Sequence, residues 1–340
     1  MRTMAIIKRI LRQLRRDKRS MALMIVAPLF ILTLMWLVLD GDTYVPEIAV
    51  VDLPSSIVKS LDEQEAEIRH IPEQEAREKL QNKELDAMIT WEESKPEVLL
   101  EGSDPTANGA VQKVLQQAMK EKAAKPVPEP ELKFLHGSEE LNLFDNTGPV
   151  LIGFFVFFFV FIVGGVSFLR ERTQGTLERL LSTPLKRWEI VFGYLGGFGL
   201  FTIVQSIIIA AFSIYVLNMY MSGEFWYVML ITFLLAMAAL SLGTLLSAYA
   251  NNEFQMMQFI PLVIVPQVFF SGIFNLETME PWLRAIGKVM PLTYGGEALR
   301  DIMIRGKGFA VFSNEVYILI GFTILFITLN ILALKRHRTL

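Results

Sequence analysis

Side chains that do covalent or proton-transfer chemistry are sparse in this chain of 340 residues. It has no cysteine, and its three histidines, His70, His136 and His337, are far apart in sequence. Disulfides, thiol catalysis and Cys-ligated zinc are therefore excluded. The sequence also lacks a GxxxxGK[ST] phosphate loop, an HExxH zinc motif and a GxSxG nucleophile elbow. We expect a protein that is not an enzyme by itself, has no catalytic or metal-binding residue and binds no cofactor of its own.

Charged residues gather instead in the segment RERTQGTLERLLSTPLKRWEI, residues 170–190, which has five Lys or Arg and three Glu. Drawn as a helix, this segment has one apolar face, formed by Leu177, Leu180, Leu181, Leu185 and Trp188. Gly175 favours a break, and Pro184 ends the helix because it restricts the residue before it. The pattern predicts a short amphipathic helix. It either lies on the surface as a loop helix or seats in a groove of a partner protein.

The elements around this segment are long apolar runs, and 52% of all residues are hydrophobic. Runs of about twenty apolar residues are typical of membrane-spanning helices. Six spans are predicted, at Met21–Leu39, Val150–Leu169, Ile190–Leu217, Phe225–Ala250, Met256–Ile273 and Val316–Leu334. The first is interpreted as an uncleaved span rather than a signal peptide, because no small-x-small cleavage site follows it. We therefore expect an α-helical polytopic membrane protein.

Basic residues predict the orientation of these spans. Residues 1–20 contain eight Lys or Arg, residues 170–189 contain five and the tail KRHR contains three. Because positive segments stay in the cytoplasm, both termini are predicted there, in a plasma or inner membrane. Residues 40–147, with eleven basic and twenty-four acidic residues, are then extracellular. Residues 274–312 fit this orientation less well, since they contain five basic residues and must also lie outside.

The chain is thus predicted to have four parts. Residues 1–20 form a basic amphipathic helix at the membrane interface, with an apolar face of Ile6, Ile7, Ile10, Leu11 and Leu14. Residues 21–39 are the first span. In residues 40–147 strands alternate with helices, one of which is predicted over residues 55–68 with a serine start, and a small extracellular α/β domain is expected. Its prolines at 126, 128 and 130 indicate an extended connector. Residues 148–340 hold the other five spans. No Asp, Glu, Lys, Arg or His lies in any span as drawn, which argues against a proton-driven pump.

Two motifs resemble type-2 ABC exporter permeases. Residues 170–190 are similar to the E-R-x-x-G-T-L-E-x-L-x-x-T-P segment of that family, and residues 269–306 resemble its S-G-x-F, P-W-L, P-L-T-Y and E-A-L-R segment. The domain between spans one and two fits the drug and lipid exporter branch. The resemblance implies partners: separate ABC ATPase subunits, which bind ATP and Mg, and a second permease, identical or a sibling. It places the ATPase-coupling helix at about 171–189, with Glu171, Arg172, Gly175, Thr176, Glu178, Leu181 and Pro184.

The resemblance also implies that residues 274–312 form re-entrant helices that cap the exit. Residues that suit this broken geometry or the headgroup level are Gly272, Pro281, Trp282, Pro291, Tyr294 and the pair Gly295–Gly296. Trp282 and Tyr294 could equally be simple interfacial anchors. Span five is interrupted by Pro261 and Pro266, and it is hypothesised to line the substrate pathway.

The residues assigned to that pathway are Gln205, Gln267 and Phe270. The alternative for the two amides is that they hold helices together. The expected function is export of an amphipathic drug, antimicrobial or lipid-like molecule, as in multidrug resistance. Two other functions stay open: ABC export of a simple cation such as sodium, and a membrane sensor whose extracellular domain is a ligand receptor. Membrane lipid is an expected partner, and nucleic acid is not.

Overall fold

The computed structural model describes residues 2–39, 45–62, 64, 66–82, 84–92, 95–102, 105–120, 141–274 and 279–336. The chain forms two compact units, one of Met1–Asp40 with Phe134–Leu340 and one of Gly41–Lys133. The first unit is helical, and the second contains a small mixed sheet. Within the described residues, six helical segments are long and apolar enough to cross a membrane. The predicted polytopic helical membrane protein with a small α/β insertion is therefore confirmed.

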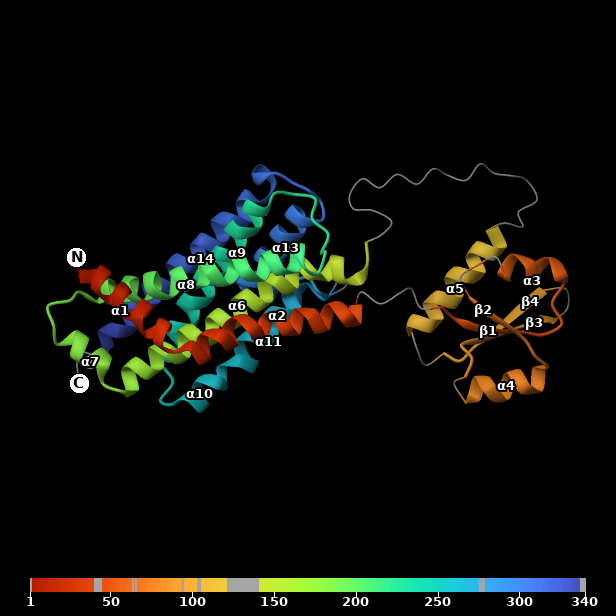
Figure 1. The fold of residues 1–340 in the computed structure, drawn as a ribbon, viewed down its shortest axis with the longest axis horizontal. Helices are drawn as coiled ribbons and strands as arrows, with labels where there is room; N and C mark the ends of the chain where they lie inside the picture. The colour runs from red at the N-terminus through yellow and green to blue at the C-terminus, as the bar shows by residue number, and fades with distance from the viewer. Residues whose placement is uncertain are drawn as a thin grey trace. The chain divides into compact units, whose positions relative to one another are not determined.

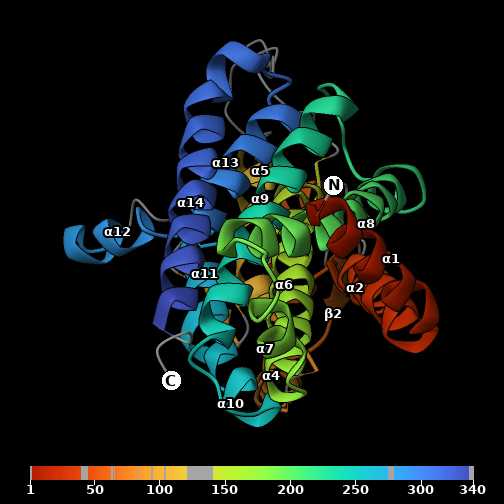
Figure 2. The same ribbon diagram turned by 90° about the vertical axis from the view of Figure 1, so that its left-hand side faces the viewer.

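The helical unit is centred on α6 and α9, which pack along each other (Figure 1). Its elements are α1 (Arg2–Arg16), α2 (Lys18–Leu39), α6 (Leu143–Thr173), α7 (Thr176–Leu181), α8 (Arg187–Tyr215), α9 (Phe225–Ser247), α10 (Glu253–Met257), the π-helical turn η1 (Ile260–Ile264), α11 (Val265–Phe270), α12 (Pro281–Gly287), α13 (Pro291–Met303) and α14 (Phe309–Arg336). The Asn142 side chain caps the start of α6 by accepting a 2.7 Å hydrogen bond from the Asp145 backbone N–H. The short helices α7 and α10 lie at the same end of the unit as α1 (Figures 1 and 2).

The fifth span is broken, as its prolines predict. It begins at Glu253, three residues before the predicted start, and consists of α10, η1 and α11 in succession. Pro261 lies in η1 and Pro266 in α11. Each proline removes a backbone donor and clashes with the preceding turn, so a continuous α-helix cannot form, and the wider π-helical turn accommodates the distortion.

The N-terminal helix α1 packs on α8. Three of its apolar residues, Ile6, Ile10 and Leu14, are buried in the main core of the helical unit. The glycines of α8 allow this approach, because a Cβ at Gly193 would lie 2.7 Å from the Ile6 side chain and one at Gly197 would lie 2.8 Å from that of Ile10. The apolar face predicted from the sequence is thus covered by protein, and a position of α1 at the membrane surface stays a prediction.

The second unit is a four-stranded sheet of order β2-β1-β3-β4. Its strands are β1 (Glu47–Val50), β2 (Glu67–His70), β3 (Ala87–Glu92) and β4 (Lys95–Leu100), and its helices are α3 (Ser55–Asp62), α4 (Glu73–Gln81) and α5 (Pro105–Lys120). Strand β1 pairs in parallel with β2 and β3, and β3 pairs antiparallel with β4. One prediction was wrong: residues 55–68 were assigned to a single helix, but the helix ends at Asp62 and β2 follows. The predicted proline connector lies outside the described residues.

The packing of α1 on α8 can be tested by adding a side chain at Gly197. We expect Gly197→Leu to lower the free energy of unfolding by about 1–3 kcal/mol, because the new side chain overlaps Ile10. The measurement is the thermal unfolding midpoint of the purified protein in detergent. Gly321→Leu in α14 is the control, since nothing lies within 4 Å of a Cβ added there. Equal midpoints for the two variants would contradict this packing.

Candidate functional site

The junction between α6 and α8 has the two breaks that the sequence predicts. Helix α6 ends at Thr173, and Gly175 has a φ of +69°, a left-handed conformation that glycine adopts without a steric penalty. Helix α7 then runs only to Leu181, before Pro184. The Lys186 backbone N–H donates a 2.7 Å hydrogen bond to the Glu189 carboxylate at the start of α8. The sequence prediction placed Trp188 on the leucine face of one helix, but it belongs to α8 and is 47% exposed.

The leucine face of the junction packs on the protein's own core. Leu177 is only 1% exposed, and Leu180, Leu181 and Leu185 are half-buried against the same cluster. The exposed residues of the junction are instead mostly polar, namely Thr173, Gln174, Glu178, Arg179, Ser182, Thr183, Pro184, Lys186 and Trp188. A protein that bound this junction would therefore meet its polar face, and the leucines would hold α7 in place from behind.

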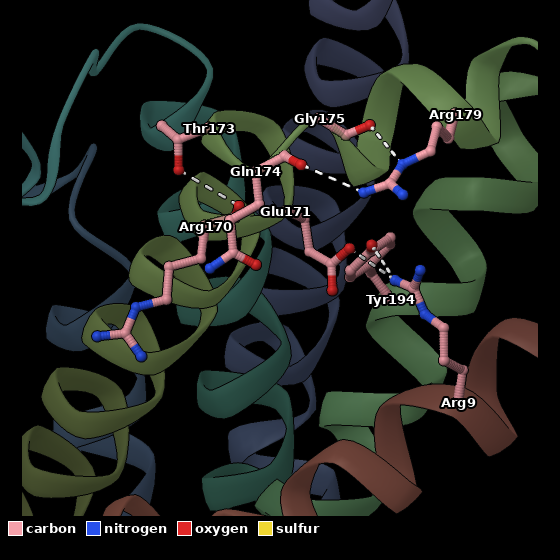
Figure 3. Close-up of polar contacts among 8 residues, drawn as sticks. All are labelled: Arg9, Arg170, Glu171, Thr173, Gln174, Gly175, Arg179 and Tyr194. Carbon is pink, nitrogen blue, oxygen red and sulfur yellow. Dashed lines mark hydrogen bonds and ion pairs between the residues drawn. The ribbon is translucent and has the colours of Figure 1, made fainter.

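The last turn of α6 is joined to α1 and α8 by a buried polar cluster (Figure 3). A guanidinium nitrogen of Arg9 lies 2.8 Å from a carboxylate oxygen of Glu171, and it donates a hydrogen bond of 2.5 Å to the Tyr194 hydroxyl. The Glu171 side chain is 9% exposed and that of Arg9 is 35% exposed. The Tyr194 ring meets Phe168 edge-on, at 5.0 Å between centroids. Removing either charge would leave the other poorly solvated, so three helices are coupled at this point.

Two further arginines fasten the end of α6 to the end of α9 and the start of α10. Arg172 donates hydrogen bonds to the backbone carbonyls of Ala248, at 2.5 Å, and Ala250. Carbonyls at the end of a helix have no partner within it, and this guanidinium supplies one. Arg170 pairs with Glu253, the first residue of α10, at 2.7 Å. The end of α6 is thus held from three sides.

The residues predicted to couple to an ATPase therefore divide into two groups. Glu171 and Arg172 point into the protein and bond to other helices. Gly175 and Thr176 shape the turn into α7, where both are half-buried. Glu178 and Pro184 are exposed, whereas Leu181 is half-buried. The sequence pattern did not identify Arg9, Tyr194 or Glu253, because each lies far from residues 170–190 in sequence or outside the motif.

The residues predicted to form a re-entrant exit region are found at breaks between short helices. Pro281 and Pro291 are the first residues of α12 and α13, a position where the missing N–H costs nothing. Gly272 has a φ of +93° after α11. Figure 2 shows α12 projecting away from α14, and its Trp282 is 65% exposed. Its last residue packs on α11, since a Cβ at Gly287 would lie 3.4 Å from the Phe270 side chain. Within this region, the Tyr294 hydroxyl donates a 2.9 Å hydrogen bond to the Lys288 carbonyl.

The pair Gly295–Gly296 does not break a helix, which corrects the sequence interpretation. Both residues lie inside α13. A Cβ at Gly295 would overlap Leu235 of α9, and a Cβ at Gly296 would lie 2.5 Å from the Ser271 carbonyl oxygen, just after α11. Gly295 thus lets α13 approach α9 closely, and Gly296 lets it approach the end of α11. That α13 takes part in an exit gate stays a prediction.

Residues 274–312 contain the five basic residues that fit the predicted membrane orientation poorly, and two of them form ion pairs with carboxylates. The Asp301 carboxylate, 9% exposed, accepts contacts of 2.5 Å from Arg305 and 2.9 Å from Lys307. Arg305 also pairs with Glu297 at 2.7 Å. Hydrogen bonds to Asp301 and then Glu297 raise the pKa of the Arg305 guanidinium above its ordinary value. The local net charge of this group is therefore small.

The residues assigned to a substrate pathway are buried within the chain and have structural contacts. Gln205 donates a 3.1 Å hydrogen bond to the Met24 carbonyl in α2. Pro28 lies four residues after Met24 and has no N–H, so this carbonyl lacks its usual helical donor. The Gln267 side chain accepts a 3.0 Å hydrogen bond from the Leu292 N–H at the start of α13, and Phe270 is 7% exposed. Both amides therefore join two helices by a hydrogen bond, as the alternative interpretation expects. A role in a substrate pathway stays a prediction.

The six candidate spans and the junction at one end of α6 define a polytopic α-helical membrane protein. The match to a family model is specific: residues 18–332 match the family described as ABC-2 family transporter protein, and the chain belongs to that family.

Curated relatives agree with this assignment. The chain is 29% identical over 175 residues to ABC transporter G family member 20 of Dictyostelium discoideum, covering 51% of this chain and 24% of that protein. It is 27% identical over 170 residues to "Probable multidrug ABC transporter permease YbhS" of Escherichia coli, covering 49% and 45%. Inner membrane transport permease YhhJ of the same species is 27% identical over 177 residues, covering 52% and 47%. The chain thus spans about half or less of the length of these relatives.

The polar cluster at the end of α6 can be tested with two matched substitutions. We expect Glu171→Gln to lower the free energy of unfolding by about 1–3 kcal/mol, because Arg9 loses its charged partner in a half-buried position. Glu178→Gln makes the same change on the exposed face of α7, and it should shift stability by less than about 0.5 kcal/mol. Thermal unfolding in detergent measures both. If Arg9→Gln and Glu171→Gln have additive effects, the two side chains are not coupled.

Proposed function

We propose that this chain is the transmembrane subunit of an ATP-driven exporter, and that the exposed face of α7 is the contact surface for a separately encoded ABC ATPase. The observation that carries this proposal is the geometry of the junction. A six-residue helix lies between two breaks, with its apolar side fixed to the core and polar residues such as Glu178, Arg179 and Ser182 outward. ATP and Mg would bind to the partner, and this chain would do no chemistry of its own.

The fastening of α6 suggests how a movement of the ATPase reaches the membrane. A displacement of α7 acts on the end of α6. There Arg170 is paired with α10, Arg172 bonds to the α9–α10 loop and Glu171 is paired with α1. Because α6 and α9 form the centre of the unit, the same displacement would turn several spans together. Gly175 would let α7 tilt without unwinding α6, since glycine tolerates a change of φ.

The substrate and the second subunit belong to the same proposal. We infer that two permeases assemble around a shared pathway and move an amphipathic drug, antimicrobial or lipid-like molecule outward. Support for this cargo comes from the largely apolar spans and from the relatives, one of which is named a probable multidrug permease. The exposed apolar side chains of Trp282, Ile286 and Val289, in and just after α12, suit contact with a second permease or with lipid at the exit. The cytoplasmic position of α7 follows from the basic segments alone.

Charge reversal on α7 tests the ATPase contact. The double variant Glu178→Lys/Arg179→Glu changes exposed side chains. It also removes the 3.4 Å hydrogen bonds from Arg179 to the Gln174 and Gly175 carbonyls, so an unchanged thermal unfolding midpoint is required of it before coupling is compared (Figure 3). We expect the ABC ATPase that copurifies with the wild-type chain to be lost, or its stimulation by substrate to fall by about tenfold, as truncation of interface anchors does. The measurement is ATPase activity of the purified complex in nanodiscs. The half-buried Leu181 makes a poorer probe, because its replacement also disturbs packing.

The control for this test is Glu224→Lys, which reverses one exposed charge. Glu224 lies just before α9, beyond the end of α8 that is farther from α7. It should leave the amount of bound ATPase and its stimulation at wild-type values. Coupling that survives the α7 double variant at equal membrane expression would rule out the exposed face of α7 as the contact surface.

A further inference from the structure

A cleft of about 330 Å³ opens between α1, α2, α6, α8 and α10. Its walls are apolar and include Leu23 and Met24 of α2 and Ile162, Val163 and Val166 of α6. The volume lies within the range of sites that hold one small molecule. Because α2, α6, α8 and the α10–α11 segment are candidate spans, the cleft lies at the level of the membrane. A water-filled apolar cleft is unfavourable there, so an apolar chain is the expected occupant.

One end of this cleft is polar. Gln13, Asp17, Arg170 and Glu253 line it, and Arg170 is ion-paired with Glu253 at 2.7 Å. Asp17 also interacts electrostatically with Arg170. The cleft therefore has an apolar interior and a charged rim where α1 turns into α2, the arrangement that an amphipathic molecule requires.

A second hollow, of about 660 Å³, adjoins this rim and shares Gln13 and Asp17 with the cleft. Its other lining residues are Arg9, Arg12 and Arg16 of α1. Arg9 is committed to Glu171, but Arg12 and Arg16 are exposed and lie on one face of α1, four residues apart. Across both hollows and the Arg9 pair, four arginines face three carboxylates, and the net charge is one positive.

We propose that the two hollows together form a binding site for an anionic glycerophospholipid from the leaflet that α1 borders. One acyl chain occupies the cleft between α2 and α6, and the phosphate is bound by Arg12 and Arg16. Guanidinium groups bind phosphate oxygens with paired, charge-assisted hydrogen bonds, which favours phosphate over other headgroup atoms. The site requires only that the chain spans a membrane, so it is independent of the ATPase contact and of the transported cargo.

Such a lipid would bridge elements that meet near the end of α6. Its acyl chain contacts α2 and α6, and its phosphate contacts α1, which the pair of Arg9 and Glu171 already joins to α6. The bound lipid should therefore stabilise the packing of α1 against the spans. Binding to the folded state raises stability in proportion to the logarithm of the ligand concentration, which gives a second measurement beside binding itself.

Native mass spectrometry of the purified full-length chain in detergent tests the site. Phosphatidylglycerol is added at increasing concentration, with phosphatidylcholine of the same acyl chains in parallel. We expect the wild type to retain one phosphatidylglycerol in preference to phosphatidylcholine and to gain thermal stability from it. Arg12→Gln and Arg16→Gln should each weaken this binding about fivefold. Val163→Trp and the smaller change Val166→Phe fill the cleft and should reduce the binding of both lipids.

The controls distinguish this site from general attraction of lipid to a basic protein. Arg15→Gln removes the same charge from the same helix, but Arg15 lines neither hollow. Ile324→Trp adds the same bulk on an exposed part of α14. Both should bind phosphatidylglycerol like the wild type. If Arg15→Gln weakens binding as much as Arg12→Gln, the attraction is diffuse and the site is wrong. Stabilisation by inorganic phosphate alone, or equal retention of phosphatidylcholine, would also overturn it.

Discussion

The ion pair between Arg9 and Glu171 determines how the rest of the helical unit is held at the end of α6. A buried carboxylate such as that of Glu171 is stable only when a cation and further donors surround it, and Arg9 can reach it only if α1 lies against α8. The closely packed glycines of α8 make that position possible, because any side chain there would displace Ile6 and Ile10. The ion pair and the glycines of α8 thus both require α1 to lie against α8. The position of α7, which follows Glu171 by five residues, depends on both.

The same constraint explains why the motif contains more charge than a membrane hairpin needs. Arg170, Glu171 and Arg172 are consecutive, so on a helix they point about 100° apart and meet three different neighbours. Arg170 meets α10, Glu171 meets α1 and Arg172 meets the end of α9. Arg170 is also partly exposed, but it is ion-paired with α10, whereas Glu178, Arg179 and Lys186 after Gly175 lie on the surface of the junction itself. One segment therefore contains a structural part and an exposed part, separated by a glycine.

The spans and the ends of α7 were predictable from the sequence, because the signals for them are local. Unbroken apolar runs predicted six spans, and Gly175 and Pro184 predicted the ends of α7, because their backbone preferences act over one or two residues. Long-range contacts were not predictable: Arg9 and Glu171 are 162 residues apart. Strand β2, with the sequence Glu67-Ile68-Arg69-His70, was missed because it is a short, charged edge strand without hydrophobic alternation. Gly295 and Gly296 were misassigned because glycine serves both breaks and close packing.

The polar residues inside the spans follow a rule that the structure makes clear. In the hydrocarbon region a backbone carbonyl without a donor is costly, so each one freed by a proline or a helix end needs a side chain. Gln205 donates to the carbonyl that Pro28 leaves without its helical partner. Asn330 differs, because it donates to the Ser241 carbonyl inside α9 and to the Phe326 carbonyl of its own helix, and so joins α14 to α9.

Arg172 does the same as Gln205 for the carbonyls of Ala248 and Ala250, just after α9. Gln267 satisfies the opposite need, since its oxygen accepts from an N–H in the first turn of α13. Gln205 and Gln267 thus satisfy backbone groups at a proline break and at a helix start, and both are buried. The faces that this chain leaves exposed on α2, η1 and α11 are apolar, and they include Leu23, Leu262 and Phe269.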